Sequence, residues 1–346
     1  MFRTTDITPG DHAYLALLRA TLEADSESDA DEAVAYAESL LRHGFPVVFD
    51  VAHVAFATGV SARTLGAIRA HPERFYRFFA LRKSDGGSRQ IAVPTPALRT
   101  VQDWLLRHVV TGFVPHDACH GFVKKRSIIT NAQGHTGQRA VVRFDVRDFF
   151  GSVKRAQVYR LFRRVGYSVA VANLFADFTT YRDSLPQGAP TSPCLANMAA
   201  ERLDHRLSRF AARNGLHFTR YADDLAFSGP TADTRKVKRT VELIMRSEGF
   251  AANDGKTRFM NQHQRQIVAG IVVNDRPNWP RSRRRWLRQE IHYLQEYGLH
   301  DHLSRRGTSP VAYKARVYGH VYALKQLCPK EAQTYLRVLD TLDWPY

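Results

Sequence analysis

The sequence predicts an α+β protein in which helical segments flank a small antiparallel sheet. The N-terminal 75 residues are rich in alanine and place apolar side chains at helical spacing, for example in residues 14–18. Residues 139–150 and 218–227 are rich in Val, Phe and Tyr, which is typical of strands. From residue 274 onward the pattern is again helical, and it is basic. This succession of helices, strands and helices favours the α+β class.

Size and charge narrow the class of protein. The chain has 346 residues, of which 44% are hydrophobic, so it can bury at least one substantial core. Fifty Lys and Arg against 33 Asp and Glu give a formal charge of +17, which favours nucleic acid over an anionic membrane as the partner. No apolar run approaches the roughly 20 residues needed to cross a bilayer, and the N-terminus does not resemble a signal peptide. We therefore expect a cytoplasmic protein with no membrane partner.

The three cysteines carry no metal or disulfide signal. Cys119, Cys194 and Cys328 are far apart and form no CxxC pair, so neither a disulfide framework nor a structural zinc site is indicated. The stretch His116–His120 lacks a second ligand pair at zinc spacing. We interpret all of these residues as packing residues.

Turn and cap residues mark further elements. Residues 83–90 have a turn composition and residues 90–94 resume an extended apolar run, which predicts a hairpin. A helix is expected from Ser192, as its cap, to Gly215. The acidic and Ser-rich segment 23–32 is expected to be a solvated linker.

Carboxylates mark the ends of the two predicted strands. Asp223 and Asp224 lie between two strand-like runs, at the tip of a predicted hairpin, and Asp145 lies toward the end of the other strand. A lone Asp-Asp pair is usually a solvated turn, but hard ions such as Mg²⁺ prefer carboxylate oxygens. Two such ions about 3.5–4 Å apart stabilise both the attacking and the leaving oxygen of a phosphoryl transfer. Three acids at two strand ends of a basic protein predict a two-metal site.

Six segments, taken in this order, make the sequence similar to a known family. The sequence resembles the reverse transcriptases, and among them the bacterial retron reverse transcriptases. The segments are Lys83–Pro94, Phe144–Phe150, Leu185–Pro193 (LPQGAPTSP), Tyr221–Asp224 (YADD), Gly249–Lys256 and Val268–Gly270.

Two blocks make the retron resemblance more specific. Asn131 to His135 matches the family's NAxxH element, and Val268 to Gly270 lies where retron enzymes carry Val-Thr-Gly. Ala269 replaces the usual threonine of that triplet. The resemblance implies that Asn131, His135 and Gly270 contact nucleic acid.

The resemblance also implies a fold and its division. We expect a right-hand polymerase with fingers, palm and thumb, preceded by a helical N-terminal extension. The expected ranges are 1–75 for the extension, 76–118 and 155–187 for the fingers, 119–154 and 188–272 for the palm, and 273–346 for a helical, basic thumb.

By position, the resemblance assigns roles to the acids and to their surroundings. Asp145, Asp223 and Asp224 are expected to hold two Mg²⁺ ions. Phe150 corresponds to the aromatic gate under the incoming sugar, although without the family an ordinary core phenylalanine would be preferred. Gln187 corresponds to a residue that touches the incoming nucleotide.

Three basic residues are expected around the triphosphate of the incoming dNTP. Arg89 and Lys83 lie on the predicted fingertip hairpin, where a guanidinium and an ammonium can hold phosphate oxygens. Lys256 corresponds to a lysine that approaches the nucleotide from the palm side. Charged hairpin tips are commonly no more than solvated, so these roles rest on the resemblance.

The C-terminal region combines arginines with an apolar stripe. Leu287, Ile291 and Leu294 recur at helical spacing. Five arginines fall within eight residues, and four of them lie on one flank of the stripe, where we expect them to bind the phosphate backbone of nucleic acid. Those four are Arg281, Arg284, Arg285 and Arg288.

As a retron-type enzyme, the protein would be a bacterial RNA-directed DNA polymerase that copies its own structured noncoding RNA into DNA. The resemblance implies priming from an internal guanosine 2′-hydroxyl, and a role in phage defence with a separate effector protein. Two alternatives stay open. One is another bacterial reverse transcriptase, intron-like or with different priming, although the tail after residue 274 is short for an intron enzyme. The other is a catalytically idle RNA-binding scaffold, which retention of all three acids disfavours.

Overall fold

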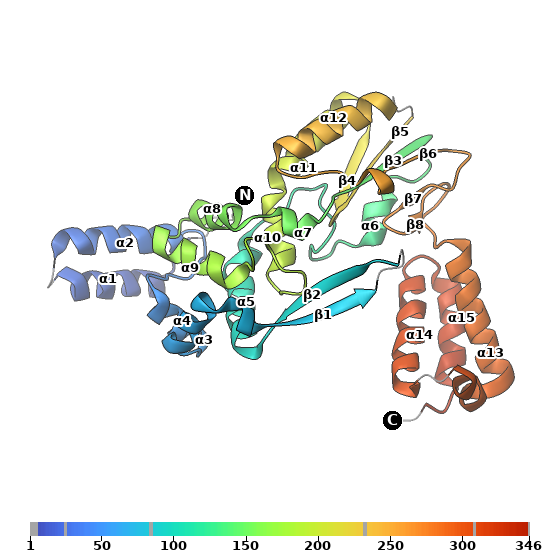
Figure 1. Ribbon diagram of the computed structural model, residues 1–346, viewed down its shortest axis with the longest axis horizontal. Coiled ribbons are helices and arrows are strands. Elements are labelled where there is room, and N and C mark those ends of the chain that lie inside the picture. Colours follow the sequence, from blue (N-terminus) through green and yellow to red (C-terminus); the bar gives the residue numbers. More distant parts are fainter. Residues whose placement is uncertain (1–5, 24–25, 83–85, 231–233, 307–308, 345–346) are drawn as a thin grey trace. The chain divides into compact units, whose positions relative to one another are not determined.

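The computed structural model describes residues 6–23, 26–82, 86–230, 234–306 and 309–344, and it is of the α+β class (Figure 1). The chain divides into two compact units. The first comprises residues 1–123, 146–207 and 239–253, and the second comprises residues 124–145, 208–238 and 254–346. Two long helices, α11 (Glu201–Arg213) and α12 (Thr234–Ser247), run from one unit into the other.

The first unit begins with paired helices. The helices α1 (Pro9–Glu23) and α2 (Glu27–Leu41) pack against each other, and α3 (Val51–Thr58) and α4 (Ala62–Ala70) follow them. The expectation of a linker over residues 23–32 is therefore partly wrong, because α2 already begins at Glu27. Ser26 caps this helix by accepting a hydrogen bond from Asp29 N. The acidic side chains of the first turn, Glu27 and Asp29, also stabilise the helix, because they lie at the positive end of its dipole.

The first unit also contains a two-stranded hairpin and a helical layer. The strands β1 (Tyr76–Arg82) and β2 (Ser88–Pro94) pair in antiparallel fashion, as the turn composition predicted. The helices around them bury the largest side chains of this unit, including Tyr167 and Phe175. These helices are α5 (Pro96–His108), α7 (Phe149–Ser152), α8 (Arg155–Val165), α9 (Val169–Thr179) and α10 (Ser192–Ala199), with 3-10 turns η1 (Pro72–Phe75) and η2 (Val110–Gly112).

The single helix expected from Ser192 to Gly215 is two helices, α10 and α11. Its cap is Thr191, and the Ser192 hydroxyl instead donates to the Pro186 carbonyl oxygen at 2.7 Å. The expected strand 139–150 is also shorter than predicted. It ends at Asp145, and Asp148 adopts a left-handed conformation (φ 44°) that turns the chain into the short helix α7.

The second unit is built on a four-stranded antiparallel sheet in the order β4-β5-β3-β6. Its strands are β4 (His217–Tyr221), β5 (Asp224–Gly229), β3 (Ala140–Asp145) and β6 (Arg258–Asn261). The helix α6 (Ile128–Gln133), the turn η3 (Asp254–Lys256) and the small hairpin of β7 (Ile267–Val268) and β8 (Ile271–Val272) accompany it. Of the central strands, β5 is buried along nearly its whole length and β3 at half of its positions.

Three helices complete the second unit: α13 (Arg281–Arg306), α14 (Pro310–Lys325) and α15 (Pro329–Asp340). The predicted stripe of Leu287, Ile291 and Leu294 is confirmed as part of their core, with each side chain at most 3% exposed. The helix α13 is kinked at Gly298, whose φ of 73° and ψ of 169° are not helical.

Within the described residues, no individual helix is both long and apolar enough to cross a membrane. The neighbouring helices α3 and α4, bent by 115°, meet the length and composition criteria only when they are taken together.

Candidate active site

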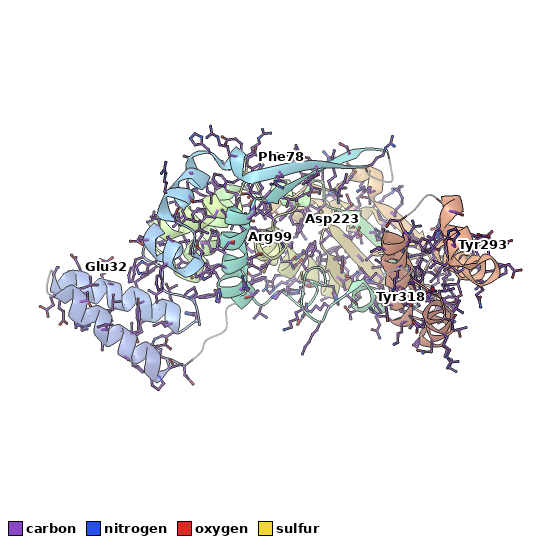
Figure 2. The ribbon with its side chains drawn as sticks, turned by 90° about the horizontal axis from the view of Figure 1, so that it is seen from below. Glu32, Phe78, Arg99, Asp223, Tyr293 and Tyr318 are labelled. Carbon is purple, nitrogen blue, oxygen red and sulfur yellow. The ribbon has the colours of Figure 1, made fainter. Side chains whose placement is uncertain are left out.

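The acids lie where the sheet ends. In the register of the second unit, Asp145 at the end of β3 is the partner of Asp224 at the start of β5, and Tyr221 of β4 pairs with Asp224 from the other side. A two-residue turn, Ala222 and Asp223, joins β4 to β5, and Asp223 is labelled in Figure 2. Strand pairing thus brings Asp145, at one end of the sheet, beside Asp223 and Asp224, which lie 78 and 79 positions further along the chain.

The turn is held in a strained conformation. Two-residue hairpin loops require a positive φ at their first position, and Ala222 adopts φ 56° although it is not glycine, at a cost of order 1 kcal/mol. Arg220, which is fully buried, donates from its guanidinium to the Ala222 carbonyl oxygen at 3.2 Å. This hydrogen bond fixes the orientation of the turn that carries Asp223. Arg220 was not predicted from the sequence, although an arginine within a buried strand indicates a specific partner.

Two cations neutralise two of the three acids. Lys256 Nζ lies 3.0 Å from Asp145 Oδ2, and Arg143 donates to Asp224 Oδ1 at 2.8 Å. Burial raises the pKa of Asp223, and the neighbouring Asp224 and Asp145 raise it further. The site therefore holds one carboxylate whose charge is incompletely compensated. Arg143, also missed from the sequence, lies two positions before Asp145, and the alternation of a strand places both side chains on one face.

Carboxylate oxygens in this number and arrangement suit hard divalent ions. In the part of the chain that the structure describes, no three His, Cys, Asp or Glu side chains already form a metal-binding group. The Asp145 and Asp224 side chains are instead engaged by Lys256 and Arg143. The residue types and the strand register fit the ions.

His135 is a buried link within the sheet unit. It is 0% exposed, and its ring nitrogens lie 2.7 Å from Thr219 Oγ1 on β4 and 2.7 Å from Ser228 Oγ on β5. Its ring therefore bridges both strands of the hairpin that carries the acids. A slip of one residue would turn these hydroxyls to the opposite face, so His135 fixes the hairpin register.

This burial corrects the expectation that Asn131 and His135 contact nucleic acid. Asn131 is 1% exposed, so neither side chain reaches a ligand surface. The glycine between them is structural too, because a Cβ on Gly134 would meet the His217 ring at 2.2 Å. The NAxxH block packs α6 onto the hairpin that carries Asp223 and Asp224. Sequence alone does not separate a buried polar motif from an exposed one.

Gly270 lies on the surface, unlike the NAxxH block. Ala269 (φ 46°) and Gly270 (φ 82°) form the two-residue turn between β7 and β8, and Gly270 is exposed with open space around it. Two consecutive positive φ values define a turn type that favours glycine or asparagine. The triplet Val268–Gly270 therefore presents its turn outward.

In the first unit, two adjacent phenylalanines have opposite surroundings. Phe149 is 3% exposed and stacks on Phe250 with ring centroids 5.8 Å apart. Phe150 is only half-buried, and its ring lies 6.1 Å from that of Phe122, which is 50% exposed. Of the two rings, Phe150 is therefore the one that a ligand can reach.

The Gln187 turn is attached to the fingertip hairpin. The Gln187 carbonyl oxygen accepts a hydrogen bond from Ala92 N of β2 at 2.7 Å. Gly188 has φ 117°, and a Cβ there would meet the Ala92 carbonyl oxygen at 2.8 Å, so only glycine fits this approach. Arg89 lies exposed on β2 as the register partner of Leu81, whereas Lys83 lies outside the described residues.

The thumb arginines divide into two groups. Arg281, Arg285 and Arg288 are exposed. Arg284 is only partly exposed and forms an ion pair with Glu331 of α15, which limits its availability to a phosphate, and Arg288 lies 3.9 Å from the same carboxylate. Arg283, the one that the stripe geometry set apart, packs its guanidinium 3.8 Å from the centre of the Trp279 ring.

Comparison with known proteins agrees with this site. The sequence pattern of the family "Reverse transcriptase (RNA-dependent DNA polymerase)" matches residues 81–294, a range that includes the three acids and the sheet carrying them. The chain belongs to the reverse transcriptases, the RNA-directed DNA polymerases.

Within that family it is of the retron type. It is 35% identical to the retron Mx65 reverse transcriptase of Myxococcus xanthus over 321 residues, which cover 86% of this chain and 73% of that protein. It is 36% identical to the retron Mx162 enzyme of the same organism, over 78% of this chain and 63% of that one. The chain is 31% identical to the retron Ec86 reverse transcriptase of Escherichia coli, over 72% of this chain and 80% of that one. Among solved structures, a telomerase of Candida tropicalis in complex with a fragment of telomeric RNA matches at a TM-score of 0.45 with 11% identity, over 78% of this chain and 55% of that one.

Proposed function

We propose that this enzyme synthesises DNA on a cognate structured noncoding RNA, using Asp145, Asp223 and Asp224 to hold two Mg²⁺ ions. The observation that carries the proposal is the strand register, which gathers the three acids at one sheet edge. The raised pKa of Asp223 supports it, because a site with an uncompensated carboxylate gains from a bound cation.

We propose that the chain is divided into the fingers, palm and thumb of a right-hand polymerase. The fingers are residues 76–118 and 155–187, the palm is 119–154 and 188–272, and the thumb is 273–346, with an N-terminal extension of residues 1–75. The antiparallel sheet that carries the acids and the three-helix basic C-terminal region support this assignment.

When bound, the ions would lower the pKa of the primer hydroxyl and stabilise charge on the transferred phosphate. The chain's own residues hold the acids in place and position the incoming nucleotide. Arg220 and His135 hold the hairpin, so that Asp223 and Asp224 need no rearrangement during the reaction. Lys256, released from Asp145, is placed to approach the incoming dNTP. Arg89 and Gln187, together with Lys83, bind its phosphate and base portions.

In this proposal, the enzyme makes DNA because an aromatic ring contacts the sugar of the incoming nucleotide. Base pairing with a template does not distinguish a ribonucleotide from a deoxyribonucleotide. An aromatic ring beneath the sugar leaves no room for a 2′-oxygen, and Phe150 is the accessible ring of its pair.

The RNA partner follows from the retron type. We propose that the RNA serves as template and primer, with synthesis starting from an internal guanosine 2′-hydroxyl, and that the system acts in antiphage defence with a separate effector protein. The exposed arginines Arg281, Arg285 and Arg288 and the outward turn at Gly270 form the RNA-binding surface. A bacterial reverse transcriptase with a different priming mode is the second candidate, supported by the same acids.

Primer extension tests the polymerase, and product chemistry tests the priming mode. The purified enzyme is given a generic RNA template, a DNA primer, dNTPs and Mg²⁺, and we expect elongation that EDTA and Asp145→Asn both abolish. As a control, Glu32→Gln removes an exposed acid of the N-terminal extension and should extend normally. In cells that express the enzyme with its neighbouring noncoding locus, DNA joined to RNA through a 2′ linkage supports retron priming. Free DNA products there, with normal primer extension, would assign the second candidate.

A further inference from the structure

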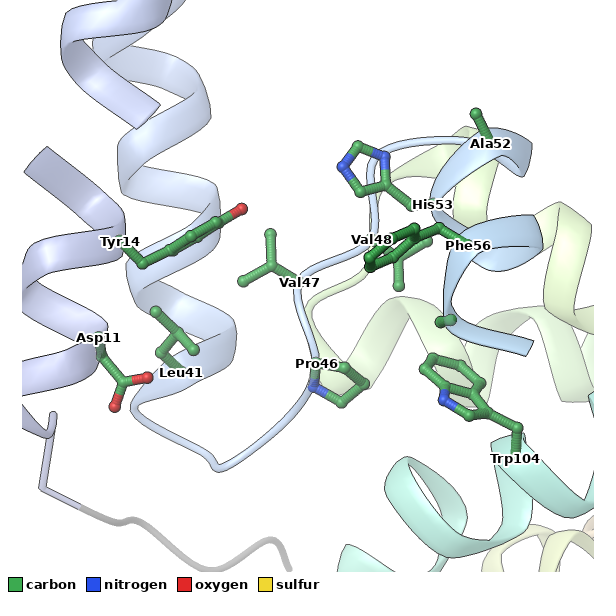
Figure 3. Close-up of a pocket in the computed structure, with 11 residues that line it drawn as sticks. Asp11, Tyr14, Leu41, Pro46, Val47, Val48, Ala52, His53, Phe56 and Trp104 are labelled. Carbon is green, nitrogen blue, oxygen red and sulfur yellow. The ribbon is translucent and has the colours of Figure 1, made fainter. Parts of the chain in front are cut away.

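An apolar groove with no role in the chemistry described above lies mostly in the N-terminal extension, and Trp104 of α5 completes it. Figure 3 shows Tyr14 and Leu41 on one side, Phe56 and Trp104 on the other, and Val47 on the connecting segment between them. The cavity has a volume of about 640 Å³ and is open to solvent. All of its lining residues belong to the first unit.

The groove leaves large apolar side chains uncovered. Phe56 is 93% exposed and Tyr14 is 37% exposed. Leu17, three positions after Tyr14 on α1, is 68% exposed, and helical spacing places it next to Tyr14. Isolated exposed apolar residues are ordinary, but an aromatic group at the rim of an apolar groove marks an interaction site.

The segment that supplies most of the groove is acidic, unlike the rest of the protein. Residues 1–50 contain ten Asp and Glu against three Lys and Arg, a formal charge of −7, whereas the whole chain carries +17. Asp11 lines the groove, and Asp50 caps α3, which supplies other residues of the lining. Hydrogen bonds from Thr8 lower the pKa of Asp11, and a hydrogen bond from the His53 N–H lowers that of Asp50. A nucleic acid would be repelled here, so this surface does not extend the RNA-binding surface.

We propose that this groove binds a basic, amphipathic helical segment of a protein partner. The apolar lining favours aliphatic or aromatic side chains, and the surrounding acids favour Lys or Arg on the polar face of the same segment. A helix fits better than an extended strand, because it satisfies its own backbone hydrogen bonds and an apolar groove offers few partners for a strand. The net negative charge of residues 1–50, with Asp11 in the lining of the groove, favours this occupant over RNA and over an acidic protein surface.

A labelled peptide tests the groove directly. The probe is an amphipathic Leu/Lys helix of roughly five turns, compared with a Leu/Glu helix of the same pattern, and binding to the full-length enzyme is followed by fluorescence anisotropy. We expect Phe56→Glu to weaken binding of the Leu/Lys peptide at least ~10-fold, since it removes the exposed ring and places a charge in the apolar groove. Leu243→Glu is the matched control: Leu243 is also exposed, at 55%, but lies on α12, and its replacement should leave the affinity unchanged.

The other outcomes are equally decisive. Equal affinity of the Leu/Lys peptide for Phe56→Glu and the parent enzyme overturns the proposal, as does a Leu/Glu peptide whose binding depends on Phe56 to the same degree. Sedimentation of the enzyme alone checks for a second copy in the groove, and a dimer that Phe56→Glu dissolves would replace the proposed occupant. Primer extension by Phe56→Glu should be normal, which shows that the variant is folded and keeps this test separate from that of polymerase activity.

Discussion

Two antiparallel hairpins of this enzyme, β4–β5 and β1–β2, differ in what surrounds them. The hairpin of β4 and β5 is part of the four-stranded sheet, and most of its residues are buried. The hairpin of β1 and β2 is exposed along most of its length, including Phe78, which is labelled in Figure 2. The first carries the acids and the second carries Arg89.

The difference matches two chemical tasks. In the proposed function the acids hold ions, which requires a fixed geometry, and His135, Arg220 and the neighbouring strands hold β4 and β5 in place. The proposed role of Arg89 is to bind a nucleotide that arrives from solvent, and Arg89 lies on an exposed strand. Phe149 and Phe150 repeat the contrast on adjacent residues. The stability of the fold should therefore depend on the buried residues His135 and Phe149, and substrate binding on the accessible residues Arg89 and Phe150.

The largest effect is expected at the buried link. His135→Ala leaves the hydroxyls of Thr219 and Ser228 without their ring partner and opens a cavity, so the free energy of unfolding should fall by about 3 kcal/mol. Urea unfolding measures it, with His263→Ala as an exposed histidine control that should change little. If both variants unfold at the same urea concentration as the parent, the hairpin is not held by His135.

The adjacent phenylalanines sharpen the comparison. Phe150→Ala should incorporate ribonucleotides more readily relative to deoxyribonucleotides, by ~100-fold, if the ring excludes the 2′-oxygen by a contact of about 2.7 kcal/mol. Competition of both nucleotide types on one RNA template measures it. Phe149→Ala should instead lower stability without changing the preference, because Phe149 packs on Phe250. The reverse pattern would mean that the neighbouring ring faces the nucleotide.

On the exposed hairpin we expect a smaller effect that is confined to binding. Arg89→Ala removes a charge-assisted contact worth about 1.5 kcal/mol, so KM for dNTPs should rise ~10-fold while the melting temperature stays constant. Arg77→Ala is the matched control, because Arg77 is also exposed on this hairpin but lies toward its base. An equal rise in KM for both variants would indicate general charge attraction in place of a specific contact.

The smallest effect concerns the stability cost of the acids. The folded pKa of Asp223 is raised above its usual value, so folding stability falls as pH rises through the interval between those two pKa values, and the ionised group destabilises the fold at neutral pH. Asp223→Asn should therefore melt at a higher temperature than the parent at pH 7 in EDTA, and the difference should shrink at pH 4. A variant that melts lower under these conditions contradicts the sign of this shift.

Sequence reasoning worked best where the signal was local. The turn at Asp223, the hairpin after Lys83 and the apolar stripe at Leu287 depend on neighbours in sequence, and the strand pairing then placed Asp145 beside Asp224. It failed where distant residues decide the outcome. His135 finds its partners 84 and 93 positions away, and Arg284 finds Glu331 47 positions away, so neither burial nor pairing was visible in the local pattern.

The central claim is that the buried hairpin performs the chemistry while other, exposed surfaces bind the RNA. Its most direct test measures, on one preparation of Asp223→Asn, both the single-turnover rate of nucleotide addition and the dissociation constant for the RNA template. The account predicts a rate at least ~1000-fold below the parent, because losing an ion ligand costs several kcal/mol of transition-state stabilisation, with an RNA affinity changed by less than about twofold. Near-parental nucleotide addition, or a loss of RNA binding as large as the loss of rate, would contradict it.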